Sequence, residues 1–171
     1  MESIGGYAFY QCTNLTNISF AKSPLTSIGK YAFAYCDGLT GVWFRGDTRL
    51  ASVGEYAFSH CTNLESVWFG KENPLETIGR YAFYQCAKLS NILFGNSSLL
   101  SVREYAFYDC GSLSSVYFVG TGIEWAQFCS GMTGNSALTS ARVYYYKEDG
   151  ANLSDAGNFW HYDENGNVVV W

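Results

Sequence analysis

The chain repeats one short segment at a nearly constant interval. A Tyr-Ala-Phe triplet is followed by Cys and, three residues later, by Leu, and this unit occurs five times in the 171 residues. Each of these leucines opens a hexad of the form Leu-x-x-Ile/Val-x-Phe, at Leu15, Leu39, Leu64, Leu89 and Leu113. The interval between them is 24 or 25 residues. A fixed period in this range is typical of a solenoid in which each turn of the coil is one repeat.

Each repeat has two extended stretches and one bend. The hexad alternates an inward Ile or Val and an inward Phe with an outward residue, which is the period of a half-buried strand. With a sixth hexad at residues 138–143, the pattern predicts a parallel sheet of about six strands. A second stretch, Leu-x-x-Ile/Val, predicts the opposite wall and ends in Gly29, Gly54 and Gly79, where we expect a turn with positive φ. The Tyr-Ala-Phe-x-x-Cys segment predicts a single helical or 3₁₀ turn, because it is too short for an independent helix.

The repeat pattern divides the chain into three parts. These are five regular repeats in residues 1–118, an atypical sixth turn in residues 119–143 and a C-terminal cap in residues 144–171. Apolar spacing predicts a short helix over residues 122–129, whereas the polar residues 144–156 predict irregular structure. At the end, Asn165-Gly166 between apolar runs predicts a β-hairpin. We expect this hairpin to fold over the last turn and hide the open end of the core.

The charge and hydropathy of the chain argue against several classes of function. Net charge is −5 and the ten Lys and Arg residues are scattered singly, so no basic stripe follows a phosphate backbone and no nucleic-acid partner is expected. No run of eighteen apolar residues is present, so no membrane span is expected. The first residues lack the basic and apolar regions of a secretory signal. Because Met1 stands where Leu25 begins a later turn, we expect a segment of a longer protein, with a small bare array as the alternative.

The cysteines form a ladder rather than pairs. Five of the six occupy one equivalent position per repeat: Cys12, Cys36, Cys61, Cys86 and Cys110. Adjacent strands are about 4.8 Å apart, and side chains stacked in parallel do not face each other as a disulfide requires. We therefore expect five reduced core thiols, and an unpaired Cys129 outside the register. The spacings match no zinc pattern, so no metal or other cofactor is expected.

The full repeat, L-x-S-I-G-x-x-A-F-x-x-C-x-x-L-x-x-I-x-F, resembles the BspA-like, or treponemal, type of leucine-rich repeat found in bacterial surface proteins. The resemblance covers residues 1–118, and the tail with its final FWHYDENGNVVVW is similar to the closing module of such proteins from gut anaerobes. It implies a curved, right-handed solenoid, a location at the cell surface or outside the cell, adhesion to other proteins and no enzymatic activity. The family's strands usually carry a small polar residue before the last apolar position, and this chain often departs from that.

The predicted contact surface is the outward face of the sheet. One outward residue per turn varies, giving the row Ser19, Trp43, Trp68, Leu93, Tyr117 and Arg142. The neighbouring outward row is small and polar: Asn17, Gly41, Ser66, Asn91, Ser115 and Ser140. An exposed aromatic row bordered by hydrogen-bonding residues indicates a site for a protein or a glycan. Alternatively, the C-terminal hairpin or a second copy of the chain covers the row, or the aromatics are there because they favour strands.

Other motifs carry weaker signals. Arg45-Gly46-Asp47 spells the tripeptide recognised by integrins, although three such residues are also ordinary loop composition. The tyrosine before each Ala-Phe is the same in every repeat, which indicates packing rather than recognition. His60 and His161 have no Ser, Cys or carboxylate at a spacing that predicts a catalytic set, so no enzyme is expected.

Two hypotheses of different classes follow from these observations. The first is a non-catalytic, adhesin-like binding module of a surface or secreted protein that uses the outward sheet face. The second is a small intracellular inhibitor or scaffold that binds one protein, which the missing signal segment and the reduced thiols favour. An enzyme is a distant third.

Overall fold

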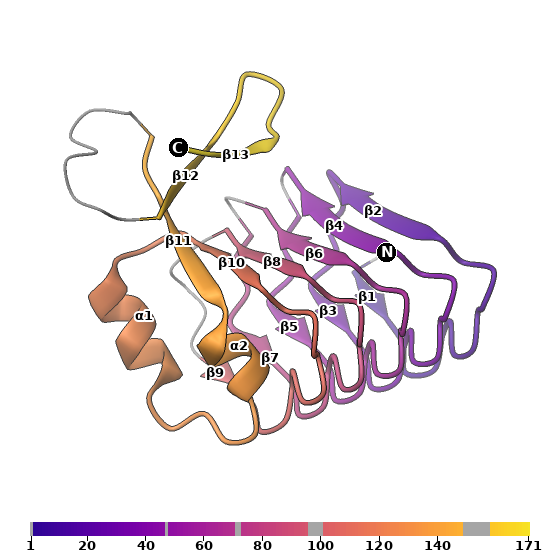
Figure 1. Cartoon of the computed structure of the whole chain (residues 1–171). Coiled ribbons are helices and arrows are strands. Elements are labelled where there is room, and N and C mark those ends of the chain that lie inside the picture. The colour runs from indigo at the N-terminus through magenta and orange to yellow at the C-terminus, as the bar shows by residue number, and fades with distance from the viewer. Residues whose placement is uncertain (1, 47, 71–72, 96–100, 149–157) are drawn as a thin grey trace.

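A computed structural model of the chain shows a solenoid with two sheets on opposite walls (Figure 1). It describes residues 2–46, 48–70, 73–95, 101–148 and 158–171. Within these residues, the longer sheet has eight strands: β2 (Asn17–Ala21), β4 (Gly41–Arg45), β6 (Ser66–Phe69), β8 (Asn91–Phe94), β10 (Ser115–Phe118), β11 (Arg142–Tyr146), β12 (Phe159–Tyr162) and β13 (Val168–Val170). The opposite sheet has five short described strands: β1 (Ser3–Ile4), β3 (Ser27–Ile28), β5 (Ser52–Val53), β7 (Thr77–Ile78) and β9 (Ser101–Val102).

The longer sheet extends beyond the repeats. From β2 to β11 it is parallel, as the hexads predict. The C-terminal hairpin then joins it, because β12 pairs in parallel with β11 and β13 pairs antiparallel with β12. The irregular structure predicted from residue 144 onward is wrong for its first three residues, which continue β11. The hairpin is therefore part of the main sheet.

The Tyr-Ala-Phe corner is built from two kinds of backbone hydrogen bond that alternate along the chain. In the first repeat, the N–H groups of Tyr7, Phe9 and Gln11 donate to carbonyls of the next turn at 2.7–3.0 Å, whereas those of Ala8 and Tyr10 donate three residues back within the turn. The tyrosine that opens each corner has φ between 55 and 59° in all five repeats, and the residue four positions later is left-handed as well. These left-handed residues interrupt the 3₁₀-type bonds, so the corner is a series of tight turns and not a helix.

The glycines before the corner are needed for a different reason from the one predicted. The expected positive φ is wrong, because Gly29, Gly54 and Gly79 are absent from the described residues with positive φ. Instead, a Cβ atom at these positions would lie 2.6–2.7 Å from backbone atoms of the preceding turn. Glycine is required here because the turns approach too closely for any side chain.

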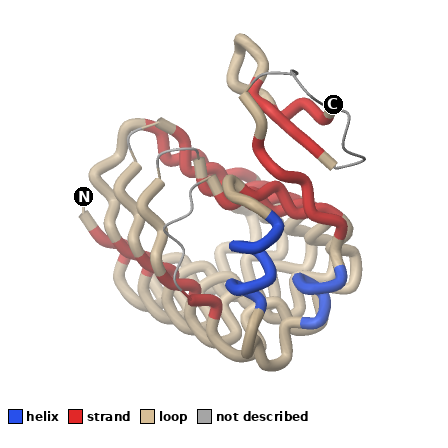
Figure 2. Tube along the Cα trace, turned by 90° about the vertical axis from the view of Figure 1, so that its left-hand side faces the viewer, coloured by secondary structure: helices blue, strands red, loops and turns tan. Residues whose placement is uncertain are grey.

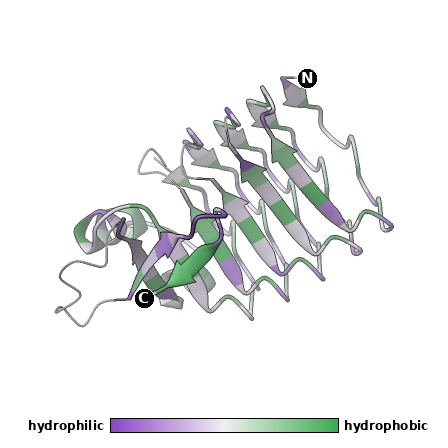
Figure 3. Cartoon of the chain, turned by 90° about the horizontal axis from the view of Figure 1, so that it is seen from above, coloured by the Kyte–Doolittle hydropathy of each residue, from purple (hydrophilic) through white to green (hydrophobic). Residues whose placement is uncertain are grey.

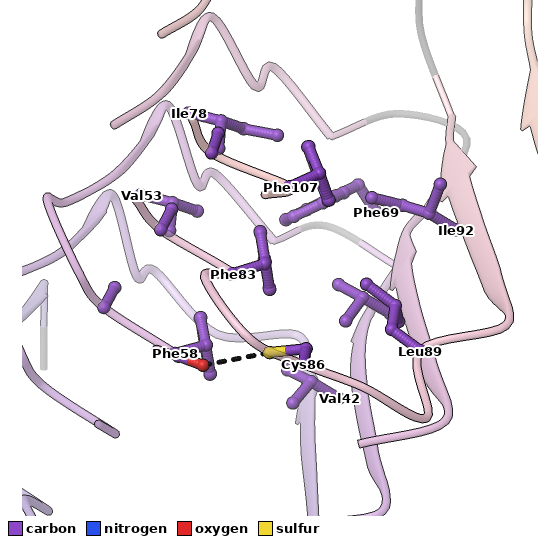
Figure 4. Packing of buried hydrophobic residues seen from close by; sticks show 14 of the residues in the cluster. Val42, Val53, Phe58, Phe69, Ile78, Phe83, Cys86, Leu89, Ile92 and Phe107 are labelled. Atoms are coloured by element: carbon purple, nitrogen blue, oxygen red, sulfur yellow. Dashed lines mark hydrogen bonds between the residues drawn. The ribbon is translucent and has the colours of Figure 1, made fainter. Parts of the chain in front are cut away.

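The core is made of side chains that repeat from turn to turn. Phe9, Phe33, Phe58, Phe83 and Phe107 form one column of stacked rings, with 5.0–5.2 Å between successive centroids. In the cysteine column, the four thiols from Cys36 onward each donate to a phenylalanine carbonyl of the preceding turn, as the Cys86 Sγ does to Phe58 O at 3.1 Å (Figure 4). All six cysteines are free, which confirms the predicted ladder. The thiol also forms a hydrogen bond between turns, which the spacing of the cysteines in the sequence does not predict.

Two helices close the C-terminal end of the core. Helix α1 (Gly122–Cys129) lies where a short helix is predicted, and α2 (Ser136–Ser140) follows it across the end of the coil (Figure 2). Thr121 and Glu124 form a capping box at the start of α1, which satisfies otherwise free N–H groups. Trp125 and Leu138 are buried in the core cluster, to which no described residue of the hairpin belongs. The helices, and not the hairpin, therefore cover the end of the core.

One buried amide ends the ladder of turns. Asn135 Oδ1 accepts the N–H of Phe107 at 2.9 Å, where earlier repeats supply the carbonyl of an alanine such as Ala106, which accepts from Phe83. Its Nδ2 donates to the carbonyls of Arg103 and Thr133. The side chain is 1% exposed. Asn135 thus replaces one peptide group of the missing next corner.

Replacing Asn135 by Ala should destabilise the protein by about 1–3 kcal/mol or more, because the buried Phe107 N–H loses its acceptor. Asn63→Ala is the matched control, since Asn63 Nδ2 donates to the carbonyl of Asp37 in an exposed hydrogen bond between turns. Urea unfolding would measure both. Equal losses in the two variants would contradict the proposed role of Asn135.

A second prediction concerns the thiols. Burial raises the pKa of Cys36 to about 11 and that of Cys110 to about 12, so at neutral pH almost no reactive thiolate is present. Without reductant, a chromogenic thiol reagent should count six groups in denatured protein. In folded protein the buried thiols should react slowly, and faster as pH rises toward 11. Two or fewer groups after denaturation would contradict the ladder.

Candidate functional site

The strand register places the predicted contact residues in rows on the outward face of the longer sheet. Pairing brings Ser19, Trp43, Trp68, Leu93 and Tyr117 into one row. The same pairing aligns Asn17, Gly41, Ser66, Asn91 and Ser115 in the neighbouring row. The alternation of the first five hexads therefore predicts these two rows correctly.

The residue predicted for the last position of each row is wrong, because the strand register is shifted by two residues there. Arg142 pairs with Ser115 and so lies in the polar row, whereas Tyr144 takes the place beside Tyr117. Ser140 lies in α2 and not in the sheet. A helix advances only 1.5 Å per residue, against about 3.3 Å for a strand, so the helical start of the sixth hexad delays the strand.

The Trp43 indole lies over Gly41 of its own strand. A Cβ atom at Gly41 would meet the Trp43 ring at 2.4 Å, so the indole occupies the space that a side chain at Gly41 would take. Trp43 is partly exposed and lies outside the core cluster. Part of the indole is thus packed against the strand, while another part is exposed.

Trp68 lies beside Trp43 in a more enclosed setting. The Arg45 guanidinium is 5.8 Å from the centre of the Trp68 ring, a cation–π distance. The Trp68 Nε1 is buried and has no hydrogen-bond partner in the described structure. Arg45 is therefore folded onto the sheet face; Asp47 of the integrin-type tripeptide lies outside the described residues.

A cavity separates this part of the sheet from the hairpin. It has a volume of about 270 Å³, and its walls include Arg45, Trp68 and Leu93 of the sheet and Tyr162, Asn165 and Gly166 of the hairpin. Leu93 is completely buried, although its position in the row predicts an exposed residue. Leu93 is buried because it lies between Trp68 and Tyr117 and faces the hairpin across the cavity.

The hairpin packs on the outward face through Trp160. This side chain is completely buried but does not belong to the core cluster. It contacts the rings of Tyr117 and Tyr146 at 5.9 and 5.0 Å, and its Nε1 donates to the carbonyl of Phe118 at 3.3 Å. The alternative that the hairpin covers the aromatic row is therefore correct for its C-terminal half. Figure 3 shows the hydrophobic β13 beside this end of the sheet.

The repeated tyrosines form a second aromatic surface at the corners. Their rings stack at 4.7–5.3 Å along the solenoid, in the column Tyr7, Tyr31, Tyr56, Tyr81 and Tyr105. A parallel chain of ring contacts runs through Tyr10, Tyr35, His60, Tyr84 and Tyr108. The stacking confirms the predicted packing role of the first column. Burial among these rings lowers the pKa of His60.

A larger recess of about 690 Å³ lies near the connection between the two helices. Its charged residues have both signs, and Arg80 is paired with Glu104 at 3.2 Å. Exposed pairs of this kind contribute little to stability. The recess lacks the concentration of aromatic side chains and single-sign charge found on the sheet face.

The described residues show no group of three or more His, Cys, Asp or Glu that could hold a metal ion. His161 stacks on Trp171 at 4.0 Å, and its Nδ1 is buried with no hydrogen-bond partner in this part of the structure. In the described part of the chain, no helix is long and apolar enough to cross a membrane.

A family model for the BspA type leucine rich repeat region matches residues 1–114 in six copies. The chain belongs to this family. The match covers the same stretch in which the two sheets, the phenylalanine columns and the cysteine ladder repeat. BspA-type repeats therefore account for the solenoid, while α1, α2 and the hairpin lie beyond the matched residues. No curated protein sequence matches the chain.

Solved structures of bacterial proteins share the fold. A leucine-rich repeat protein of T. pallidum has a TM-score of 0.60 and 28% identity, over 68% of this chain and 51% of that one. A leucine-rich cell surface protein of Faecalibacterium prausnitzii has a TM-score of 0.63 and 26% identity, over 75% and 32%. A leucine-rich repeat protein of Bacteroides ovatus has a TM-score of 0.57 and 25% identity, over 86% and 40%. The matches span at most about half the length of these proteins.

Sequence reasoning missed three residues that shape the site: Tyr144, Trp160 and Tyr162. The signal for Trp160 was available, because in Phe159-Trp160-His161-Tyr162 the alternation puts Trp160 and Tyr162 on one face. What the alternation does not reveal is that β12 joins the sheet and turns this face outward. The hexad pattern does not point to Tyr144, because it implies an extended strand throughout residues 138–143, whereas the hexad begins inside α2.

Replacing Trp160 by Ala should release the hairpin and leave the repeats folded. The local cost should be about 3–5 kcal/mol, as for other buried tryptophans. In hydrogen exchange, the N–H groups of Tyr145 and Lys147, which donate to Asn158 and Trp160 carbonyls, should lose protection. The N–H of Phe83 in the central corner should keep it. Trp171→Ala is the control, since Trp171 is 48% exposed; loss of protection at Phe83 in the Trp160 variant would contradict this prediction.

Proposed function

We propose that this chain is a non-catalytic protein-binding module whose contact surface is the N-terminal half of the outward sheet face. The observation that carries the proposal is the pair Trp43 and Trp68, which lie side by side in register and are both partly exposed. Aromatic side chains and arginine contribute most of the binding energy at protein interfaces. Arg45, against Trp68, adds the arginine to this group.

The polar row supplies the border of this surface. Asn17 is exposed, and its Oδ1 accepts from Thr40 Oγ1 at 2.9 Å. Ser66, on the strand of Trp68, and Asn91, on the next strand, are partly exposed. Interfaces commonly combine such a polar rim with an aromatic centre. Tyr117 and Leu93 belong to the same row, but the hairpin limits their role in the present arrangement to shaping the surface.

We place the module in an adhesin-like protein at the bacterial cell surface. The support is membership of the BspA-type family together with the likeness to a protein described as a leucine-rich cell surface protein. Because that likeness spans 32% of the relative, further parts of such a protein can carry functions of their own. A second copy of this chain and a glycan are alternative partners for the same face.

The variant Trp43→Ser tests the proposed face. Proteins retained by the immobilised wild-type chain would be identified, purified and titrated against both forms. We expect at least tenfold weaker binding by the variant, which corresponds to about 1.4 kcal/mol. Its melting temperature should change little, because Trp43 lies outside the core cluster.

Tyr108→Ser is the matched control, since Tyr108 is a 47% exposed aromatic at the corner surface. It should bind as the wild type does. Loss of binding in this variant, with full binding in Trp43→Ser, would move the contact surface to the tyrosine corner. Sedimentation of the wild type would reveal self-association, and its loss in Trp43→Ser would assign it to the same face.

A further inference from the structure

We infer that the cavity between the sheet and the hairpin is an anchor pocket for one acidic side chain of the protein partner. The juxtaposition that carries the inference is that of Arg45 and Trp68 on the sheet with Tyr162 on β12, all three lining one cavity. The inference rests on the proposed function, because it names the chemistry by which the same face selects its partner.

The size and walls of the cavity fit a single side chain. Its volume of about 270 Å³ lies just below the range of about 300–1,000 Å³ that is usual for whole small-molecule sites. The Trp68 indole and the buried Leu93 provide apolar walls that suit the methylene groups of a glutamate. Trp43 lies next to Trp68 in register, outside the cavity, where the backbone around that side chain would rest.

Charge on this face favours an anion. At the outward positions of the described strands β2 to β11, the charged residues are Arg45 and Arg142, in a chain whose net charge is −5. None of the residues described as lining the cavity is acidic. The hairpin turn has two acidic residues beside the lining: Asp163 already accepts three hydrogen bonds at 2.8–3.0 Å from Asn165 and Asn167, and Glu164 is exposed and does not line the cavity.

The hydrogen-bonding groups of the lining residues also favour an acceptor. Trp68 Nε1 is a buried donor with no partner in the described structure, and an indole N–H can only donate. Burial raises the pKa of Tyr162 to about 12, so its hydroxyl remains protonated and able to donate. The Arg45 guanidinium and the Tyr162 hydroxyl belong to residues that line the cavity, and donors of this kind complement a carboxylate.

The experiment uses the full chain labelled with ¹⁵N and a probe that carries one carboxylate. N-acetyl-glutamate α-amide is titrated while the indole N–H resonance of Trp68 is followed. Its neutral isostere, N-acetyl-glutamine amide, is the matched ligand. We expect saturable shifts at millimolar probe, and binding at least tenfold weaker for the glutamine form, because charge-assisted bonds to Arg45 are lost.

Variants connect the effect to the pocket. Arg45→Gln should remove the preference for the charged probe, whereas Arg142→Gln, on the same face but outside the cavity, should retain it. Asp47→Asn, which removes the acidic side chain two residues after Arg45, should leave binding unchanged or tighter. Equal binding of both probes, or equal effects of the two arginine variants, would overturn the inference.

Glucuronic acid separates a glycan source of the carboxylate from a protein source. Tighter binding of glucuronate than of the glutamate probe at Trp68 would overturn the assignment to a protein side chain. The result is independent of the proposed function, since no partner protein is used. If Trp43→Ser loses partner binding while the probes fail to bind, the proposed face stands and the pocket does not; the reverse result would retain the pocket as an acid site and reject the face.

Discussion

The alternating hydrogen bonds of the Tyr-Ala-Phe corner are the constraint on which the rest of the structure depends. Every second N–H donates to the next turn, and the others donate within the turn, so each repeat is fixed to its neighbour through its backbone. A left-handed non-glycine residue costs about 1–2 kcal/mol, and the ladder must offset that cost at two positions per repeat. The close approach of the turns then accounts for glycine at position 29 and its equivalents, for rings stacked near 5 Å, and for thiols that reach the preceding turn's carbonyls.

A ladder of backbone hydrogen bonds leaves N–H or C=O groups without partners where it ends. At the C-terminal end, the Asn135 side chain provides a partner. Asn135 supplies an acceptor where the next alanine carbonyl would be, while Trp125 and Leu138 cover the C-terminal end of the core. With the end closed by helices, the hairpin is free to extend the sheet. Its Trp160 packs on the outward face instead of on the core.

This arrangement decides which part of the sheet can meet a partner. The rows of outward residues are continuous, but the hairpin covers the part around Tyr117 and leaves Trp43 partly exposed. Between the covered and uncovered parts lies the cavity with Arg45, Trp68 and Tyr162. The BspA-type repeats thus form a regular sheet face, and the hairpin beyond them covers one end of this face and forms one wall of the cavity.

The sequence by itself determined the repeat, the parallel sheet, the identity of the core columns and the outward rows as far as Tyr117. It could do so because each follows from a local period of about 25 residues or of two. Only the tertiary structure decided the left-handed corners, the close contacts at the glycines, the shift that replaces Arg142 by Tyr144, and the burial of Leu93. Those features depend on backbone atoms of a neighbouring turn or on a hairpin distant in sequence, and the repeat of a residue type does not by itself specify its φ angle or its contacts.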